Sequence, residues 1–496
     1  MAAPSTRREC THPRAVLAGF SFPTYGRGGA RTCQRNSCRV PCSLVALIGA
    51  PTQRHFGVPS RDSPTTLSLI RTQDLDASVI GAGPAGCCAA SVLARAGRKV
   101  AVLEREPLPR YRVGESLLPH CWFPLNRLGL VDAVDASGFV VPKHSVQFIS
   151  TEGVSSRPFY FFQHSDHPKA RTWQVKRQEF DQLLIEHTIE SGARLLEETA
   201  AHVLLRDEHG AVIGVEVEDE HGRRPLHARV TIDASGRDLF AASRNKWRVS
   251  DEHLNKVAIW SYFEGAKRDP GVDEGATTIA YLEGRGWFWY IPLANDQVSV
   301  GVVADAEHLF RDERDPAAIF AREVAAQPWI AEHLATGRRL VDFRTTRDFS
   351  YRARHCAEDG LVLTGDAFSF LDPVFSSGVL LALHGGILAG DAVEAALEAN
   401  DVRGESFADY GETLCRNIEN MRQLVHAFYD PQFSFSRFLG EHPRFREDVT
   451  DILIGDLDRD YRELFAAIQG YARVPQPLVH GGPLGDVTRA PSSRPT

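Results

Sequence analysis

The chain has 496 residues, of which 43% are hydrophobic and 24% are charged, and its formal net charge is −8. This is the composition of a globular protein with a sizeable core, and the negative charge argues against general nucleic-acid binding. The most apolar stretch, residues 379–397, contains His384, Asp391 and Glu394. No segment therefore reaches the roughly 18 unbroken apolar residues of a membrane span, and we expect neither a nucleic-acid partner nor a membrane span.

The first 72 residues differ in kind from the rest, because they hold ten arginines, no lysine and one acidic residue before Asp62. Two interpretations fit this stretch: an organelle transit peptide, which is rich in Arg and Ser and poor in acids, or an extension upstream of the true start. We exclude it from the fold. The protein is expected to be cytoplasmic, with organelle targeting by residues 1–72 as the alternative.

The cysteines and histidines do not indicate a metal site. Cys38 and Cys42 have the spacing of a zinc-binding pair, but no matching pair follows at the distance of a zinc finger. The tightest histidine cluster, His164 and His167, lies in a polar loop without an obvious further ligand. We predict that no metal is bound.

A glycine-rich turn lies between two predicted strands and opens a predicted helix. A strand is expected at 78–80, the turn at 81–86, the helix at 87–96 and the second strand at 99–103. This order is the context in which the pattern G-x-G-x-x-G indicates a dinucleotide-binding turn. The alternative, a glycine-rich turn without a ligand, is weakened by that context.

The residues of the turn have separate tasks. Gly81 allows a sharp turn, Gly83 lets backbone N–H groups approach a pyrophosphate, and Gly86 lets the helix pack closely on the strand. Glu104, at the end of the second strand, is placed to accept hydrogen bonds from a ribose diol. Further contacts are expected from Pro84 and Ala85 of the same turn.

The chain then alternates predicted strands and helices before a mostly helical end. Helices are expected at 121–136, 178–192, 380–399 and 407–429, and strands at 146–150, 160–162, 173–177, 193–196, 200–205, 212–217, 228–233 and 360–364, with a run of strands over 257–305. The nucleotide-binding βαβ unit is thus separated from its later strands by inserted antiparallel sheet. A substrate region is expected in that insertion.

Two later turns favour FAD over NAD as the dinucleotide. The predicted strand before Gly365 ends in Asp366, whose carboxylate suits the ribityl or pyrophosphate arm of a long cofactor. The same segment continues to Ser376 to Gly378, which open a helix whose N–H groups are placed to face a flavin ring. The other later turn is at residues 230–236, which repeat the strand-to-glycine pattern of the first turn at 81–86. Three such turns in this order indicate an extended flavin.

At this point the chain resembles the flavin-dependent halogenases of the tryptophan-halogenase superfamily, phenol- and pyrrole-type branch, over roughly residues 74–430. Trp287-Phe-Trp289-Tyr-Ile291-Pro292 matches the family's W-x-W-x-I-P, and Phe370 to Gly378 matches F-x-x-P-x-x-S-x-G. Gly114-Glu115-Ser116 matches as well. The resemblance implies an α/β fold: a Rossmann-like FAD-binding domain of the aromatic-hydroxylase and halogenase type, with inserted antiparallel sheet and a helical C-terminal part.

The implied domain boundaries are 1–72 for the extension, 73–375 for the FAD-binding domain with its inserted substrate sheet, 376–472 for the helical region over the pocket, and 473–496 for a flexible tail. The implied cofactors are FAD, used as FADH2, and chloride or bromide. A separate NAD(P)H-dependent flavin reductase is the expected partner, and the substrate is a small aromatic molecule, free or bound to a carrier protein.

The resemblance also implies a mechanism. Hypohalous acid forms from halide and oxygen at a C4a-hydroperoxide of the reduced flavin, and Lys143 directs it to an electron-rich aromatic ring. The backbone N–H groups of Ser377 and Gly378 are expected to bind the halide, because helix amino ends favour anions. The plainer interpretations are a solvated surface lysine at position 143 and simple helix caps at Ser376 and Ser377.

The remaining predicted site residues follow from the same resemblance. Trp287 and Trp289 share one face of a strand and separate the flavin from the substrate. The predicted tunnel wall also includes Ile291, Pro292 and Phe375, and the predicted cofactor contacts are completed by Arg112, Ser116, Arg177, Asp366 and Val379.

One departure from the family pattern bears on the substrate. Members that act on tryptophan have a glutamate just before Ser-Thr-Gly, and here that position is Phe375. Phenols and pyrroles, which activate themselves through O–H or N–H loss, are therefore favoured over free tryptophan. Two other activities of the same fold stay open, an aromatic monooxygenase and an isoprenoid reductase, as does a non-catalytic flavin-binding protein.

Overall fold

The glycine-rich turn folds as a parallel βαβ unit in the computed structural model, which describes residues 75–284 and 286–485. Strand β1 (Leu75–Ile80) leads into helix α1 (Pro84–Arg95) and then into β2 (Val100–Leu103). The predicted extension, residues 1–72, lies outside the described residues. Both strands are apolar and almost wholly buried, as expected for strands covered on both faces of a parallel sheet.

The first sheet brings the three predicted turns to one edge. Its order is β17-β18-β10-β1-β2-β7, and β18, β10, β1, β2 and β7 run parallel. Ile80 is in register with Leu103 on one side and Asp233 on the other, and Asp233 with Leu363. The carboxyl ends of these strands are therefore neighbours, which is where open α/β sheets bind ligands.

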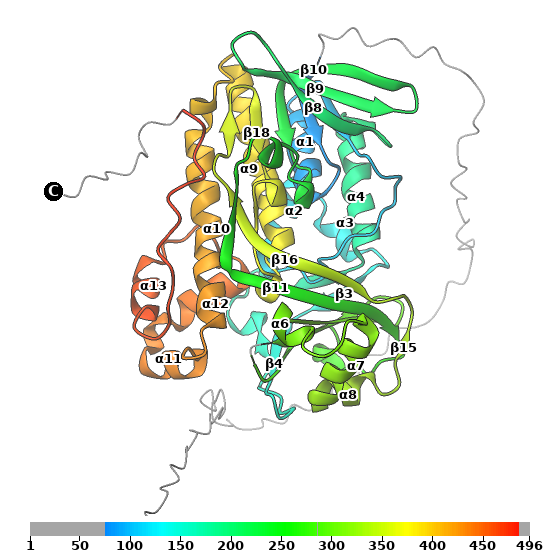
Figure 1. Ribbon diagram of the computed structural model, residues 1–496, viewed down its shortest axis with the longest axis vertical. Coiled ribbons are helices and arrows are strands. Elements are labelled where there is room, and N and C mark those ends of the chain that lie inside the picture. The colour runs from blue at the N-terminus through cyan, green and yellow to red at the C-terminus, as the bar shows by residue number, and fades with distance from the viewer. Residues whose placement is uncertain (1–74, 285, 486–496) are drawn as a thin grey trace, which may run out of the picture. The chain divides into compact units, whose positions relative to one another are not determined.

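The further strands of this sheet are β7 (Arg194–Leu196), β8 (Ala200–Arg206), β9 (Val212–Asp219), β10 (Gly222–Asp233), β17 (Ala357–Glu358) and β18 (Leu361–Leu363). Strands β8, β9 and the first half of β10 form an antiparallel extension, seen at the top of Figure 1.

A second, mostly antiparallel sheet forms the predicted insertion, in the order β19-β16-β11-β14-β13-β12-β4-β5. Its strands are β4 (Ser145–Ile149), β5 (Phe159–Tyr160), β11 (Arg248–Glu264), β12 (Thr277–Tyr281), β13 (Trp287–Leu293), β14 (Gln297–Asp305), β16 (Arg344–Ala353) and β19 (Ser369–Phe370), with β15 (Arg338–Arg339) beside β11. One face packs against α6 (Ala306–Leu309), α7 (Pro316–Ala326) and α8 (Pro328–Leu334) through a core that includes Phe288, Phe320 and Ile330. The other face is left for the site.

A separate two-stranded ribbon holds the predicted catalytic lysine. Strand β3 (Val140–Lys143) pairs antiparallel with β6 (Thr172–Val175), and Lys143 lies opposite Thr172. Helix α4 (Arg177–Glu190) follows β6 directly.

Helices α1 and α9 (Gly378–Glu398) pack closely against each other at two glycines of α9. A Cβ at Gly386 would lie 2.3 Å from the Ala85 carbonyl oxygen, and one at Gly390 would lie 2.8 Å from Cβ of Val92. Among the described residues, α9 alone has the length and apolarity of a membrane-crossing helix. Most of it is buried between α1 and α10 (Ala408–Tyr429) (Figure 1), so its apolar composition serves the core of the fold.

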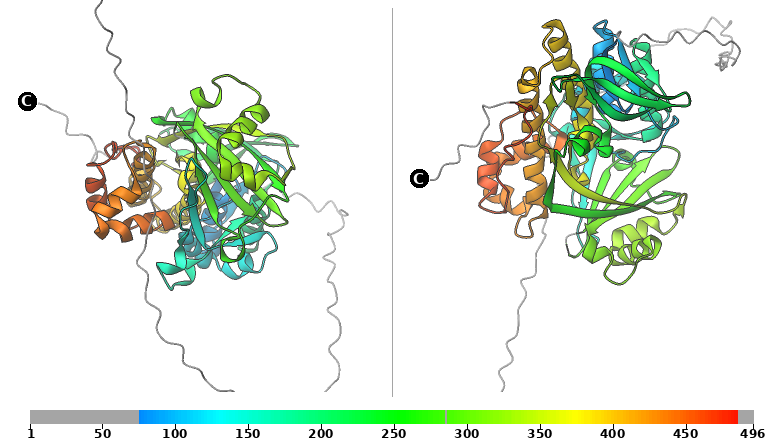
Figure 2. Two further views of the ribbon diagram at one scale, coloured as in Figure 1. Left: turned by 90° about the horizontal axis from the view of Figure 1, so that it is seen from below. Right: turned by 45° about the horizontal axis from the view of Figure 1, so that its top comes forward.

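The remaining helices cover the edges. They are α2 (Trp122–Leu128), α3 (Val131–Asp135), α5 (Phe240–Arg244), α11 (Phe435–Glu441), α12 (Arg446–Ile454) and α13 (Arg462–Ile468). Figure 2 shows α11 to α13, in orange and red, on the side of α10 that faces away from the two sheets.

Three local predictions were wrong. The helix expected over 121–136 is two helices, because Gly129 takes a left-handed conformation with φ of 75° and ends α2. Only Phe159 and Tyr160 are in a strand, and Phe161 begins a 3-10 turn. The tail predicted to be flexible from residue 473 is held as far as 485: Gly481 N–H donates to Arg354 and Leu484 N–H to Ala357.

Candidate active site

A cavity of about 1010 Å³ lies at the carboxyl ends of the first sheet and reaches the face of the second sheet. Most of the predicted site residues line it: Gly81, Gly83, Pro84, Ala85, Glu104, Arg112, Ser116, Arg177, Trp287, Trp289, Ile291, Asp366, Gly378 and Val379. Five do not: Gly86, Lys143, Pro292, Phe375 and Ser377. Its volume is ample for a dinucleotide.

The glycine turn has the shape that a pyrophosphate requires. Gly81 has a φ of 103°, and a Cβ there would lie 2.5 Å from the Ala234 carbonyl oxygen. A Cβ at Gly86 would lie 2.0 Å from the carbonyl oxygen of Gly81. At Gly83, by contrast, only the Arg110 guanidinium comes within 4 Å, at 3.7 Å. The backbone at Gly83 is therefore open to a ligand, and the turn fits a dinucleotide.

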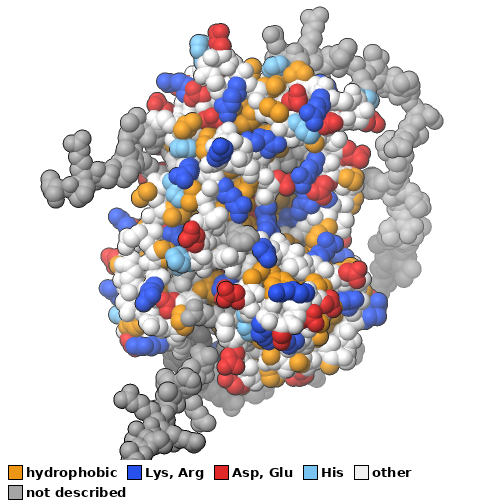
Figure 3. All heavy atoms as spheres, viewed as in Figure 1, with side chains coloured by type: hydrophobic (Ala, Val, Ile, Leu, Met, Phe, Trp, Pro, Cys, Tyr) orange, Lys and Arg blue, Asp and Glu red, His pale blue; other side chains and the backbone are white. Residues whose placement is uncertain are grey.

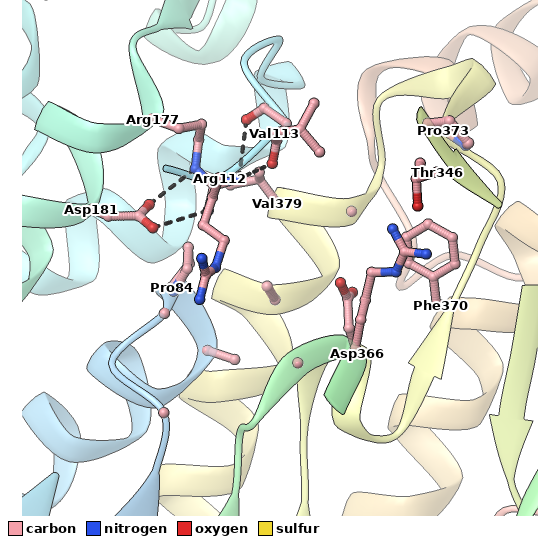
Figure 4. A pocket seen from close by; sticks show the side chains of 18 of the residues that line it. Pro84, Arg112, Val113, Arg177, Asp181, Thr346, Asp366, Phe370, Pro373 and Val379 are labelled. Carbon is pink, nitrogen blue, oxygen red and sulfur yellow. Dashed lines mark hydrogen bonds and ion pairs between the residues drawn. The ribbon is translucent and has the colours of Figure 1, made fainter. Parts of the chain in front are cut away.

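Arg110, which no sequence motif indicated, contacts two buried carboxylates beside this turn. Its Nε donates to Glu104 at 3.0 Å and its Nη1 to Asp181 at 3.0 Å. Arg177 donates to the other oxygen of Asp181 at 3.0 Å and to the Val113 carbonyl at 2.6 Å (Figure 4). A single buried arginine between two carboxylates has no sequence pattern that would reveal it.

The mouth of the cavity is rich in arginine. Arg112 pairs with Glu106 at 2.7 Å, and the resulting ion pair holds the pKa of the Glu106 carboxyl below its usual value. Arg237 lies over the ring of Phe370, with 4.8 Å between guanidinium carbon and ring centre. Figure 3 shows basic side chains gathered at the hollow on this face. Such an entrance attracts anions, including phosphates and halides.

The turn before α9 presents polar groups at its tip. Asp372 accepts from the Val374 N–H at 3.1 Å and so caps the 3-10 turn of residues 373–375, and Ser376 is left-handed with φ of 56°. The Ser377 side chain makes no cap hydrogen bond, so its interpretation as a simple cap is wrong. Its hydroxyl is buried without a hydrogen-bond partner within the described structure, and a Cβ at Gly378 would meet nothing within 4 Å. This helix start fits a small anion.

Three tryptophans, rather than the predicted two, form one wall of the cavity. Trp287 and Trp289 on β13 have ring centres 6.2 Å apart, and Trp260 on β11 lies 6.2 Å from Trp289. Gly301 on the neighbouring strand makes room for the second ring, because a Cβ there would lie 2.2 Å from it. Trp260 lies outside the W-x-W motif, so only the pairing of β11 with β14 brings it to this wall.

Lys143 is fully buried, so its interpretation as a surface lysine is wrong. Its Nζ donates to Ser116 Oγ at 2.8 Å and to the Leu117 carbonyl at 3.0 Å, and lies 5.7 Å from the centre of the Phe161 ring. Burial among neutral groups lowers the pKa of the amine to about 7. Lys143 thus lies behind the cavity wall and is joined to it through Ser116.

Phe375 belongs to an aromatic group beside this wall. It is 5% exposed and meets the rings of Phe428 and Phe435 edge-on at 5.5 and 6.5 Å, while Phe428 stacks on Tyr281 at 5.7 Å.

Within residues 75–284 and 286–485, no group of three or more metal-ligating side chains occurs.

Comparison with known proteins agrees with this geometry. The family model described as tryptophan halogenase matches residues 76–170 and 163–433. The chain belongs to the tryptophan halogenase family. This halogenase is therefore an FAD-dependent oxidoreductase that uses chloride or bromide, which confirms the predicted family, enzyme class and cofactors.

Its relatives include one enzyme named for a carrier-bound pyrrole and one named for tryptophan. A 1H-pyrrole-2-carbonyl-[peptidyl-carrier protein] chlorinase of Pseudomonas fluorescens is 30% identical over 85% of this halogenase and 99% of its own length. A tryptophan 2-halogenase of Chondromyces crocatus is 33% identical over 71% of this chain and 67% of its own length.

Solved structures confirm the fold. The flavin-dependent brominase Bmp2 superposes with a TM-score of 0.73 at 27% identity, over 80% of this chain and 99% of the brominase. The chondrochloren halogenase CndH superposes with a TM-score of 0.68 at 31% identity, over 80% of this chain and 94% of its own. The predicted α/β fold with a helical C-terminal part is thus confirmed.

Proposed function

We propose that this protein halogenates an electron-rich pyrrole or phenol ring, free or held on a carrier protein, with Lys143 directing the halogen. The observation that carries the proposal is the buried lysine amine held by Ser116 Oγ and the Leu117 carbonyl. A lysine is seldom fully buried without an anionic partner unless its chemistry is needed.

Reduced FAD, when bound, supplies hypohalous acid from oxygen and chloride or bromide. The chain's own residues hold the halide and guide the product. The Gly378 N–H and the unpartnered Ser377 hydroxyl are the proposed halide donors, at the positive end of α9. Ser116, which lines the cavity and accepts a hydrogen bond from Lys143, lies on the proposed route to the amine.

Lys143 has two usable states near neutral pH, because its pKa is lowered to about 7. The ammonium donates a hydrogen bond to hypohalous acid. The free amine takes the halogen from it as the oxygen–halogen bond breaks, and the hydroxide leaves as water with a proton from the amine. Trp287 and Trp289, with Ile291, keep the aromatic substrate from the flavin side. That separation favours halogenation over the hydroxylation that a monooxygenase of this fold carries out.

The substrate class is supported by two observations. Pyrrole-2-carbonyl groups on a carrier protein are halogenated by a relative that this chain covers almost completely. Phe375 lies among aromatic rings, and the nearby carboxylate of Asp372 is occupied by the Val374 N–H and by Tyr429. A substrate that activates itself through its own O–H or N–H fits such a site. We further propose that a separate NAD(P)H-dependent reductase supplies the flavin and that the enzyme works in the cytoplasm.

The test supplies purified protein with FAD, a flavin reductase, NADH, oxygen and bromide or chloride. The panel contains free pyrroles and phenols, pyrrole-2-carboxylate loaded on a peptidyl carrier protein, and tryptophan, because one relative is a tryptophan 2-halogenase. Mass spectrometry detects the halogen isotope pattern. Hydroxylated products alone would show that the enzyme is a monooxygenase, and halogenated tryptophan alone would refute the proposed substrate class.

A further inference from the structure

The indole N–H groups of the tryptophan wall are each held by a hydroxyl group. Trp287 donates to the Tyr429 hydroxyl at 2.8 Å, and Trp260 donates to the Tyr111 hydroxyl at 2.8 Å. Trp289 donates to Ser299 Oγ at 3.1 Å. A buried indole N–H needs a partner, so the positions of these hydroxyls determine how the rings are turned.

The first hydroxyl leads to a buried carboxylate at the turn before α9. The Tyr429 O–H donates to Asp372, with 3.0 Å to each carboxylate oxygen, and Asp372 is 1% exposed. Burial raises the pKa of the Tyr429 hydroxyl well above its usual value, so this group stays protonated and able to donate. Since Asp372 also caps the turn through the Val374 N–H, one carboxylate contacts both the turn and the partner of Trp287.

The other two hydroxyls lead to a second buried carboxylate, Glu115. The Tyr262 O–H donates to Glu115 and lies 2.9 Å from the Tyr111 hydroxyl. Burial raises the pKa of the Glu115 carboxyl, and the neighbouring Tyr262 and Ser299 hydroxyls act in the opposite direction. Glu115 is followed directly by Ser116, the residue that accepts from Lys143.

We infer that Asp372 and Glu115 are positioning residues that fix the orientation of the three indole rings. Asp372 joins the tryptophan wall to the turn before α9, where the halide is proposed to bind, and Glu115 joins it to Lys143 through Ser116. This inference rests on the proposed function. It assigns each carboxylate an effect at a distance: a loosened wall lets hypohalous acid escape before it reaches the amine, although the flavin is still oxidised. The tyrosines act as the links through which the carboxylates hold the rings.

The test compares Tyr429→Phe, Asp372→Asn and Glu115→Gln with a matched control, Tyr461→Phe. Tyr461 is 2% exposed and donates to the Asp456 carbonyl at 2.6 Å, outside the cavity lining. Two quantities are measured: acrylamide quenching of tryptophan fluorescence in the cofactor-free protein, and halogenated product formed per flavin oxidised. The wall holds three of the seven tryptophans, so a change in its packing is visible in the total fluorescence.

We expect Tyr429→Phe to increase quenching and to lower the halogenated product per flavin by about 3- to 10-fold, the value of one hydrogen bond. Flavin oxidation should keep its rate, and the KM for halide should rise because the turn is loosened. Glu115→Gln should lower the yield with an unchanged KM for halide. The control should match the unchanged protein in all of these.

Unchanged quenching and yield in Tyr429→Phe and Glu115→Gln would overturn the inference, as would equal losses in Tyr461→Phe. Should Asp372→Asn fail to fold, Tyr429→Phe removes the same link while keeping the carboxylate. A protein that halogenates no aromatic before any substitution would refute the proposed function instead. The quenching of the cofactor-free variants would then still decide whether the carboxylates hold the wall.

Discussion

Two buried lysines flank the tryptophan wall, and they differ in their partners rather than in their burial. Lys143 is fully buried and Lys256 is 5% exposed. The amine of Lys256 lies 2.8 Å from Asp305 and over the ring of Tyr429 at 4.5 Å. The amine of Lys143 meets only a hydroxyl and a carbonyl among its hydrogen-bond acceptors.

The difference separates a structural lysine from a chemical one. A carboxylate partner turns a lysine into half of an ion pair, whereas neutral acceptors leave the charged form poorly solvated. The pKa of Lys143 is lowered to about 7 for this reason. Burial alone therefore does not mark a reactive lysine, and the charge of its neighbours must be known as well.

The largest expected effect is on activity. Lys143→Ala should lower halogenation at least about 100-fold, the usual contribution of a positioned acid–base group, while flavin oxidation continues. Lys256→Ala is the control and should retain halogenation within a few-fold. The measurement is the initial rate of halogenated product beside the rate of flavin oxidation. Loss of both rates in Lys143→Ala would mean that this lysine is structural.

The second prediction concerns the pH dependence of stability. Since the folded pKa of Lys143 is lowered from 10.5 to about 7, the unfolded chain binds more protons between these values. This lysine therefore destabilises the fold most below pH 7, and the penalty disappears as the pH rises towards 10.5. Relative to the unchanged protein, Lys143→Met should lose stability with rising pH by up to about 1.4 kcal/mol per unit in this range.

Urea unfolding at pH 7 and pH 9 measures that change. Lys256→Met serves as the comparison, because its amine is paired with Asp305. A stability difference for Lys143→Met that stays constant between the two pH values would contradict a lowered pKa.

A carboxylate with cationic partners should show the opposite sign. Burial favours the protonated form of Asp251, but the His426 imidazole at 2.8 Å and the Arg422 guanidinium at 2.9 Å lower its pKa from 3.8 to about 2. The charged form therefore stabilises the fold above pH 3.8 by about 2 kcal/mol. This contribution is lost as the pH falls towards 2.

Asp251→Asn removes that contribution and provides the test. The difference in unfolding free energy between the variant and the unchanged protein should narrow as the pH falls from 5 to 3. A difference that is equal at both values would show that Asp251 is not held in its charged form.

The smallest effect is expected at the second lysine. Lys256→Met should cost about 1 kcal/mol of unfolding free energy, because the remaining carboxylate of Asp305 is 47% exposed and stays solvated. Thermal unfolding at neutral pH measures it. A loss several times larger would show that the ion pair contributes more than a solvated surface ion pair does. It would weaken the contrast between a structural lysine at position 256 and a chemical one at position 143.

Local sequence patterns predicted the parts of the site that are local. The glycine turn, the two tryptophans on β13 and Lys143 were found from spacing and resemblance, because each signal lies within one or two elements. The helix over 121–136 was drawn too long, since a single left-handed glycine, Gly129, outweighs the apolar periodicity around it.

The parts that depend on distant contacts were not predicted. Trp287 and Tyr429 are 142 positions apart in the chain, and Arg110 and Asp181 are 71 apart. Trp260 reaches the wall only because β14 lies between β11 and β13. Such contacts follow from the order of strands in the sheet and from side-chain packing. The hydrophobic periodicity of a single sequence predicts neither of them.

The close contact of α1 with α9 has a mechanical consequence. The amino end of α1 begins at the dinucleotide turn, and the amino end of α9 begins at Gly378. Gly386 and Gly390 bring the two helices into close contact. The helices therefore behave as one rigid unit that has a ligand-binding turn at the start of each helix. The distance between the two helix starts is therefore fixed by backbone packing. A ligand must match that distance to contact both turns, whatever the side chains around it do.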